Sequence, residues 1–148
     1  MNHKKIILFL GASWLCGAMA WAQMPDLLPM PQQCIVGEGR YPAPASFLYK
    51  GLNETDSINR KFAQSLLQGT DKAKDYWKLV IGERGDRAVR KVRQRIPDVS
   101  EGYYLRIREN EIIIAGNDER GTLYGLQTLR QLLRSEELPE LEITDFPD

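Results

Sequence analysis

Apolar and polar residues alternate most regularly between residues 103 and 108. One side of an extended chain there would carry Tyr103, Leu105 and Ile107. The other side would carry Tyr104, Arg106 and Arg108. This period of two predicts a β-strand, and the apolar run 112–114 predicts a second one. Asn110 lies between them and tolerates the positive φ of a tight turn, so we expect a β-hairpin.

The residues after the hairpin follow a helical period instead. A helix is predicted from about residue 119 to 134, capped by Asn117 or Asp118. At 100° per residue, one face holds Thr122, Gly125, Leu126, Leu129 and Leu133. Glycine at position 125, with Gly121 at the border of this face, would let the helix backbone come close to a sheet.

Two further helices are expected upstream. The first runs over 57–68, with Asp56 as its cap and Gly69 as its stop. Its apolar stripe would be Ile58, Phe62, Leu66 and Leu67. The second is capped by Asp86 and ends before Pro97. Its apolar face would be Val89, Val92 and Ile96.

Short strands are also predicted at 34–36, 47–49, 77–81 and 141–143, where apolar or aromatic runs are bounded by turn residues. Together with the hairpin these give about six strands and about three helices. The predicted fold class is α+β: a mainly antiparallel mixed sheet with the helices packed on one face.

Residues 1–22 form a distinct segment. Lys4 and Lys5 precede an apolar run that ends in Ala20-Trp21-Ala22, which is typical of a secretory signal peptide with its cleavage site. A membrane anchor is the alternative, but the run is short for a bilayer and contains Gly11 and Gly17. We therefore expect export to the periplasm or the medium and a domain over residues 23–148. Cys16 has no small residue before it, which disfavours a lipid anchor.

Composition narrows the chemistry. The chain has 20 basic and 20 acidic side chains, which gives no reason to expect nucleic acid or a membrane surface as a partner. The only histidine, His3, would be removed with the signal peptide, so Ser-His or Cys-His catalysis and imidazole metal sites are excluded. Cys34 would be the single remaining cysteine and cannot form an internal disulfide. No cofactor is expected.

Several segments then resemble a known family. They are residues 81–86 (Ile-Gly-Glu-Arg-Gly-Asp), 95–98 (Arg-Ile-Pro-Asp), 101–105 (Glu-Gly-Tyr-Tyr-Leu), 115–122 (Ala-Gly-Asn-Asp-Glu-Arg-Gly-Thr) and 138–147. They resemble the N-terminal, non-catalytic domain of bacterial glycoside hydrolase family 84 enzymes, the O-GlcNAcase-like β-N-acetylglucosaminidases. The helix motif at 116–129 is shared with the same domain of family 20 hexosaminidases. A family 20 enzyme therefore remains an alternative as the parent of this domain.

The resemblance implies a small domain beside a (β/α)₈ barrel that cleaves GlcNAc-containing glycans. In such parents the substrate's acetamido oxygen attacks the anomeric carbon while adjacent aspartates assist. No two aspartates are adjacent here, and the sequence lacks the barrel segment expected after residue 147. We therefore predict no catalytic, cofactor or metal residue, and an isolated chain that is inactive. A stand-alone secreted module that binds glycan or protein remains an alternative.

Some residues still invite a functional interpretation. Asp118 and Glu119 are carboxylates at a helix start, where capping accounts for them without catalysis. The aromatic candidates for sugar stacking are expected to be core or interface residues: Tyr41, Tyr49, Trp77, Tyr103 and Tyr104. A solvated face is favoured over a phosphate site for Arg84, Arg87, Arg90, Lys91, Arg93 and Arg95. Turn roles are predicted for Asp98, Glu101 and Asp145, and burial for Cys34.

Overall fold

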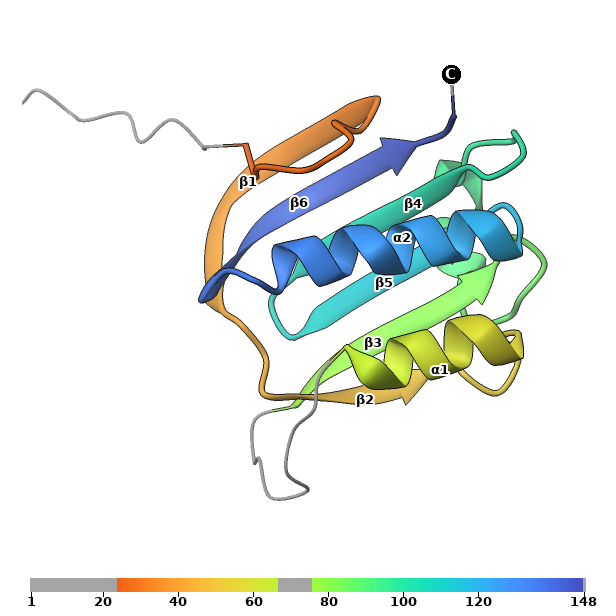
Figure 1. Cartoon of the computed structure of the whole chain (residues 1–148), viewed down its shortest axis with the longest axis horizontal. Coiled ribbons are helices and arrows are strands. Elements are labelled where there is room, and N and C mark those ends of the chain that lie inside the picture. The colour runs from red at the N-terminus through yellow and green to blue at the C-terminus, as the bar shows by residue number, and fades with distance from the viewer. Residues whose placement is uncertain (1–23, 67–75, 148) are drawn as a thin grey trace, which may run out of the picture.

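Two α-helices lie side by side on one face of a six-stranded sheet (Figure 1). The structure is a computed structural model that describes residues 24–66 and 76–147. Its strands are β1 (Gln33–Pro42), β2 (Ser46–Lys50), β3 (Tyr76–Glu83), β4 (Tyr103–Arg108), β5 (Glu111–Gly116) and β6 (Glu137–Asp145). Its helices are α1 (Ser57–Ser65), the 3₁₀ helix η1 (Arg90–Arg95) and α2 (Glu119–Leu132).

The strand order is β1-β6-β4-β5-β3-β2. The pairs β1–β6, β6–β4 and β4–β5 are antiparallel, whereas β5–β3 and β3–β2 are parallel. The predicted fold class, a mixed and mainly antiparallel α+β sheet, is confirmed. The last described strand, β6, lies between β1 and β4 and pairs with both, so strands from the two ends of the described chain are neighbours.

The hairpin forms as its alternation predicts. Leu105 pairs with Ile114 across β4 and β5, and Asn110 has a φ of 60° in the turn. The apolar side of the hairpin belongs to the main core between the sheet and the two α-helices. In α2, Gly125 lies so close to the sheet that a Cβ there would be 2.7 Å from Cγ2 of Ile114. The prediction of a close helix–sheet approach at Gly125 is confirmed.

The stripe predicted for α1 is partly wrong. Asp56 does cap this helix, but Ile58 is 68% exposed while Asn59 is buried. The Asn59 amide donates to Oδ2 of Asp56 at 2.6 Å and to the carbonyl of Glu119 at 2.8 Å. The side-chain nitrogen of this buried amide has both of its donors used, although Oδ1 accepts no hydrogen bond from the described residues, and Asn59 rather than Ile58 faces inward. Leu67 and Gly69 lie outside the described residues.

The second predicted helix also differs. Asp86 does not cap a helix; its Oδ2 accepts a hydrogen bond from the N–H of Glu83 at 2.7 Å. Residues 90–95 form a 3₁₀ helix. Val92 within it, and Val89 and Ile96 at its two ends, are buried as their spacing predicts. These three residues pack with alternate residues of the sheet, on the face opposite the main core. The helices therefore cover both faces, which corrects the expectation of one.

Candidate functional site

One carboxylate ties the loop before β4 to the start of α2. Oδ1 of Asp118 accepts from the N–H of Gly121 at 2.9 Å, and Oδ2 accepts from the N–H of Glu101 at 2.8 Å. Oγ of Ser100 donates to the same Oδ2 at 3.3 Å. Desolvation would raise the pKa of Asp118, but these donors outweigh it and hold the pKa below its usual value. The prediction that Asp118 caps α2 is confirmed.

Glu119 is acidic like Asp118, but its side chain does not cap the helix. Its side chain is exposed on the first turn of α2, where a negative charge complements the helix dipole. Both oxygens of Asp118 accept hydrogen bonds from protein donors. The two carboxylates therefore lie at the start of α2, where Asp118 caps the helix.

Glu101 extends this network to the outer side of α2. Nη1 of Arg120 donates to its Oε1 at 2.7 Å, and the hydroxyl of Tyr124 donates to its Oε2 at 3.4 Å. The backbone of Glu101 has a φ of 64°, so the chain turns sharply here. The turn role predicted for Glu101 is confirmed, and its side chain also holds two residues of α2.

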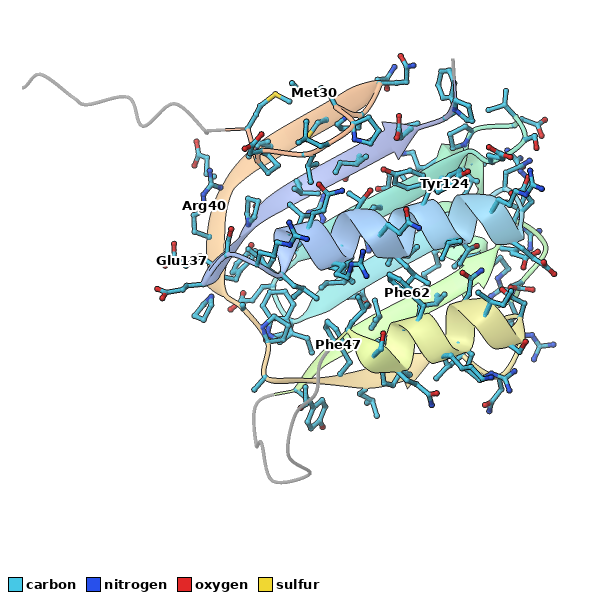
Figure 2. All side chains as sticks on the ribbon, viewed as in Figure 1. Met30, Arg40, Phe47, Phe62, Tyr124 and Glu137 are labelled. Atoms are coloured by element: carbon cyan, nitrogen blue, oxygen red, sulfur yellow. The ribbon has the colours of Figure 1, made fainter. Side chains whose placement is uncertain are left out.

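A groove with a volume of about 350 Å³ opens beside Glu101. Its walls come from the segment before β1, from α2 and from the end of β6. Large apolar side chains are exposed around it: Met30 is 68% exposed, and Tyr124 and Phe146 are 37% exposed. Figure 2 shows Tyr124 on α2 and Met30 on the segment before β1. We call this feature the terminal groove.

The walls of the terminal groove are held by hydrogen bonds between distant segments. The side-chain amide of Gln131 on α2 binds both the N–H and the carbonyl of Leu28, each at 3.0 Å. Oδ1 of Asp145 accepts from the N–H of Gln32 at 3.0 Å. Asp145 is the last residue of β6, not a turn residue as predicted. Because these contacts fix the segment before β1, the groove is preformed.

The aromatic candidates for sugar stacking lie mostly in the interior. Buried rings are those of Trp77, Tyr103 and Tyr104. The hydroxyl of Tyr103 lies 2.8 Å from Oγ1 of Thr128, and desolvation raises the pKa of this tyrosine. Partly buried rings at the edge of the main core are those of Tyr41 and Tyr49. The prediction of core positions is confirmed for the three buried rings.

The basic residues between 84 and 95 do not share one role. Arg84 is tied inward, donating to Oδ1 of Asn117 at 2.7 Å and to the carbonyl of Ile96 at 2.6 Å, and it pairs with Asp98 at 3.6 Å. Partners within the structure also hold Arg93 and Arg95. The other three line a hollow on the second face of the sheet: Arg87, Arg90 and Lys91. The predicted solvated face therefore applies to part of this set.

Other candidate chemistry is limited among the described residues. Cys34 is half-buried in β1, and burial raises the pKa of its thiol, which lowers its reactivity. Across 24–66 and 76–147, no three His, Cys, Asp or Glu side chains come together as a possible metal site. In the same ranges, no helix has both the length and the apolar character needed to cross a membrane.

Sequence reasoning missed both the terminal groove and the hollow. The groove combines residues such as Met30, Tyr124 and Phe146, which are far apart in the chain. No local pattern marks them as neighbours. The one usable signal was the exposure expected of Tyr124, which falls outside the apolar face predicted for α2.

Comparison with known proteins gives a consistent result. A family model described as "Glycosyl hydrolase family 20, domain 2" matches residues 24–146. The solved structure of CpGH84B is 26% identical, with a TM-score of 0.64 over 82% of this chain and 22% of that chain. A glycoside hydrolase family 20 β-N-acetylglucosaminidase shares the fold at 23% identity and a TM-score of 0.58, over 84% of this chain and 23% of its own.

A third structure, the β-N-acetylhexosaminidase from Bacteroides fragilis, is 24% identical with a TM-score of 0.52, over 82% of this chain and 24% of that one. The chain therefore spans less than a quarter of the length of each of these three proteins.

Proposed function

We propose, because this chain belongs to the family described as glycosyl hydrolase family 20, domain 2, that it serves as the accessory domain of an exported β-N-acetylglucosaminidase. The match over residues 24–146 carries this proposal, because it includes every strand and helix described above. The similar structures of CpGH84B and of a family 20 β-N-acetylglucosaminidase support it. The parent is then a glycoside hydrolase of the family 84 or family 20 type, with family 84 favoured by the sequence motifs.

The catalytic domain of the same enzyme would bind at the terminal groove. Exposed apolar side chains that cluster on a surface mark an interaction site, and Met30, Tyr124 and Phe146 surround this groove. Glu101 and Asp145 supply polar groups at its walls. An apolar centre with polar groups around it is the usual composition of a protein–protein interface.

The chemistry would lie in the partner domain, a (β/α)₈ barrel. There the acetamido group of a GlcNAc residue would act as the nucleophile, with carboxylates of the barrel as acid and orienting group. The domain described here would supply a rigid surface. The bond between Glu101 and Arg120 and the Asp118 cap would hold the loop beside the groove in one conformation.

Hydrolysis by the purified chain tests the division of labour. With an aryl β-N-acetylglucosaminide as substrate, we expect no turnover above the buffer rate, and we expect the DNA that follows codon 148 to encode a barrel with adjacent aspartates. Turnover that disappears in Asp118→Asn or Glu119→Gln would overturn the proposal, because it would place the chemistry in this domain.

Binding of the barrel tests the groove. We expect Tyr124→Ser combined with Phe146→Ser to weaken the association at least tenfold, since both side chains lose apolar contact. Ile58→Ser is the matched control, because Ile58 is a 68% exposed apolar residue on α1 that does not line the groove. Isothermal titration calorimetry measures both variants, and equal losses would rule out this docking surface.

Export is a separate part of the proposal. It is supported by the charged start and apolar run of residues 1–22. Mass spectrometry of the protein recovered outside the cytoplasm should give a chain that begins at Gln23. Recovery of the protein only inside the cell, with Met1 still present, would contradict this part.

A further inference from the structure

We propose that the hollow beside η1 binds an anionic saccharide, one that carries sulfate or carboxylate groups. This basic hollow has a volume of about 420 Å³ and lies among the ends of β2 and η1 and the middle of β3 and β5. Val80 and Ile113 form part of its floor, and they belong to the face of the sheet opposite the main core. It is therefore separate from the terminal groove. Its size falls within the range of about 300–1,000 Å³ that is usual for small-molecule sites.

The hollow is strongly basic. Two carboxylates line it, those of Glu54 and Glu111. Six cationic side chains from four separate segments also line it: Lys50, Lys78, Arg87, Arg90, Lys91 and Arg106. A net positive hollow on a chain whose 20 basic and 20 acidic residues balance is a local concentration of charge. Such a concentration attracts anions over a distance of about a Debye length, roughly 8–10 Å at moderate salt.

One of the two carboxylates is already neutralised. Oε2 of Glu111 lies 3.1 Å from Nζ of Lys78, and its Oε1 lies 3.0 Å from Nη2 of Arg106. Desolvation would raise the pKa of Glu111, but these two cations lower it, so the carboxylate stays ionised and holds both side chains in place. Within the described ranges, no hydrogen bond or ion pair engages the side chains of Lys50, Arg87, Arg90 or Lys91. They remain able to bind an added anion.

The backbone beneath these cations is fixed. Gly51 follows Lys50 with a φ of 86°, and a Cβ there would overlap the carbonyl of Ile81 and lie 2.8 Å from Cβ of Ala88. The end of β2 is thus packed directly against the segment that leads into η1. On the other side, the side chains of Val89 and Val92, at and within the first turn of η1, are buried. A rigid backbone reduces the entropy that is lost when a ligand binds.

A saccharide is favoured over other anions because of where the domain works, and this part rests on the proposed function. A domain attached to a glycan-cleaving enzyme meets glycans at high local concentration, and a second contact with an acidic chain would raise the overall affinity. The requirement for sulfate or carboxylate groups rests on the charge of the hollow alone. The hollow would therefore hold the acidic part of a glycan while the partner domain cleaves elsewhere.

The test measures binding of a chondroitin sulfate tetrasaccharide to the full chain by isothermal titration calorimetry. We expect one molecule bound per chain, weaker binding as salt increases, and no binding of the neutral tetrasaccharide of GlcNAc. Arg90→Gln with Lys91→Gln should weaken binding about tenfold. Lys50→Gln, from a different segment, should weaken it about threefold.

The matched control removes two exposed charges elsewhere, Lys61→Gln with Arg134→Gln, and should change the affinity less than twofold. An equal loss in this control, or an absence of binding at low salt, would overturn the proposal. Equal affinity for a single-stranded oligonucleotide of matched charge would also overturn it, since the hollow would then be a general polyanion surface. The barrel takes no part in this experiment, so its outcome is independent of the docking test.

Discussion

Replacing Asp118 by alanine should destabilise this domain, because one carboxylate joins two parts of the chain. The substitution removes the bond to the N–H of Gly121 at 2.9 Å and the bond to the N–H of Glu101 at 2.8 Å. Loss of a helix N-cap costs about 1 kcal/mol. A hydrogen bond to a charged group is worth about 1.5–3 kcal/mol. Because water partly reaches the carboxylate, we take the low end of this range and expect a total of about 2.5 kcal/mol.

Urea unfolding followed by far-ultraviolet circular dichroism measures this loss. For a small domain the free energy of unfolding falls by about 1–3 kcal/mol per molar urea, so the midpoint should fall by roughly 1 M. Glu119→Ala is the control, since it removes an equal charge from the next position without a side-chain cap. It should cost less than about 0.5 kcal/mol.

Two results would refute the reasoning. If Asp118→Ala lowered the free energy of unfolding by less than about 0.5 kcal/mol, the two bonds would not be what anchors the loop. If Glu119→Ala cost as much, the effect would come from charge at the helix start and not from hydrogen bonding.

Three shorter predictions follow from the same packing. The native chain should be more stable than Asp118→Asn by a constant free energy above pH 5. This difference should shrink as the pH falls below about 4, because folding lowers the pKa of Asp118; unfolding titrations at each pH measure it. Gly125→Val should cost about 1–3 kcal/mol in urea unfolding, since its side chain meets Ile114. Tyr103→Phe should cost about 1 kcal/mol in thermal unfolding by leaving Thr128 without its partner.

Local periodicity predicted much of the fold. The hairpin and α2 were identified because each has a regular pattern with its own turn or cap, as at Asn110 and Asp118. The segment around η1 differs from its prediction because Val89, Val92 and Ile96 have spacings of three and four that suit an α-helix as well as a short 3₁₀ helix. Which of these forms depends on the sheet face beneath it, which no local pattern contains.

The α1 stripe failed for a related reason. Ile58 is more apolar than Asn59, so the sequence places isoleucine inward. In the structure the buried position is set by the carbonyl of Glu119 and the carboxylate of Asp56, which together accept both hydrogens of the Asn59 amide. A hydrogen bond to a residue 60 positions away is invisible to helical periodicity.

The sequence by itself determined the fold class, most strands, the caps of α1 and α2 and the family resemblance, because these depend on residues within a few positions of one another. Only the tertiary structure decided that η1 covers the second face, that Met30 meets Tyr124 at one groove, and that Lys50 joins Arg90 at one hollow. These surfaces are assembled from separate segments by the strand order. Their position follows from how β6 and β3 pair within the sheet.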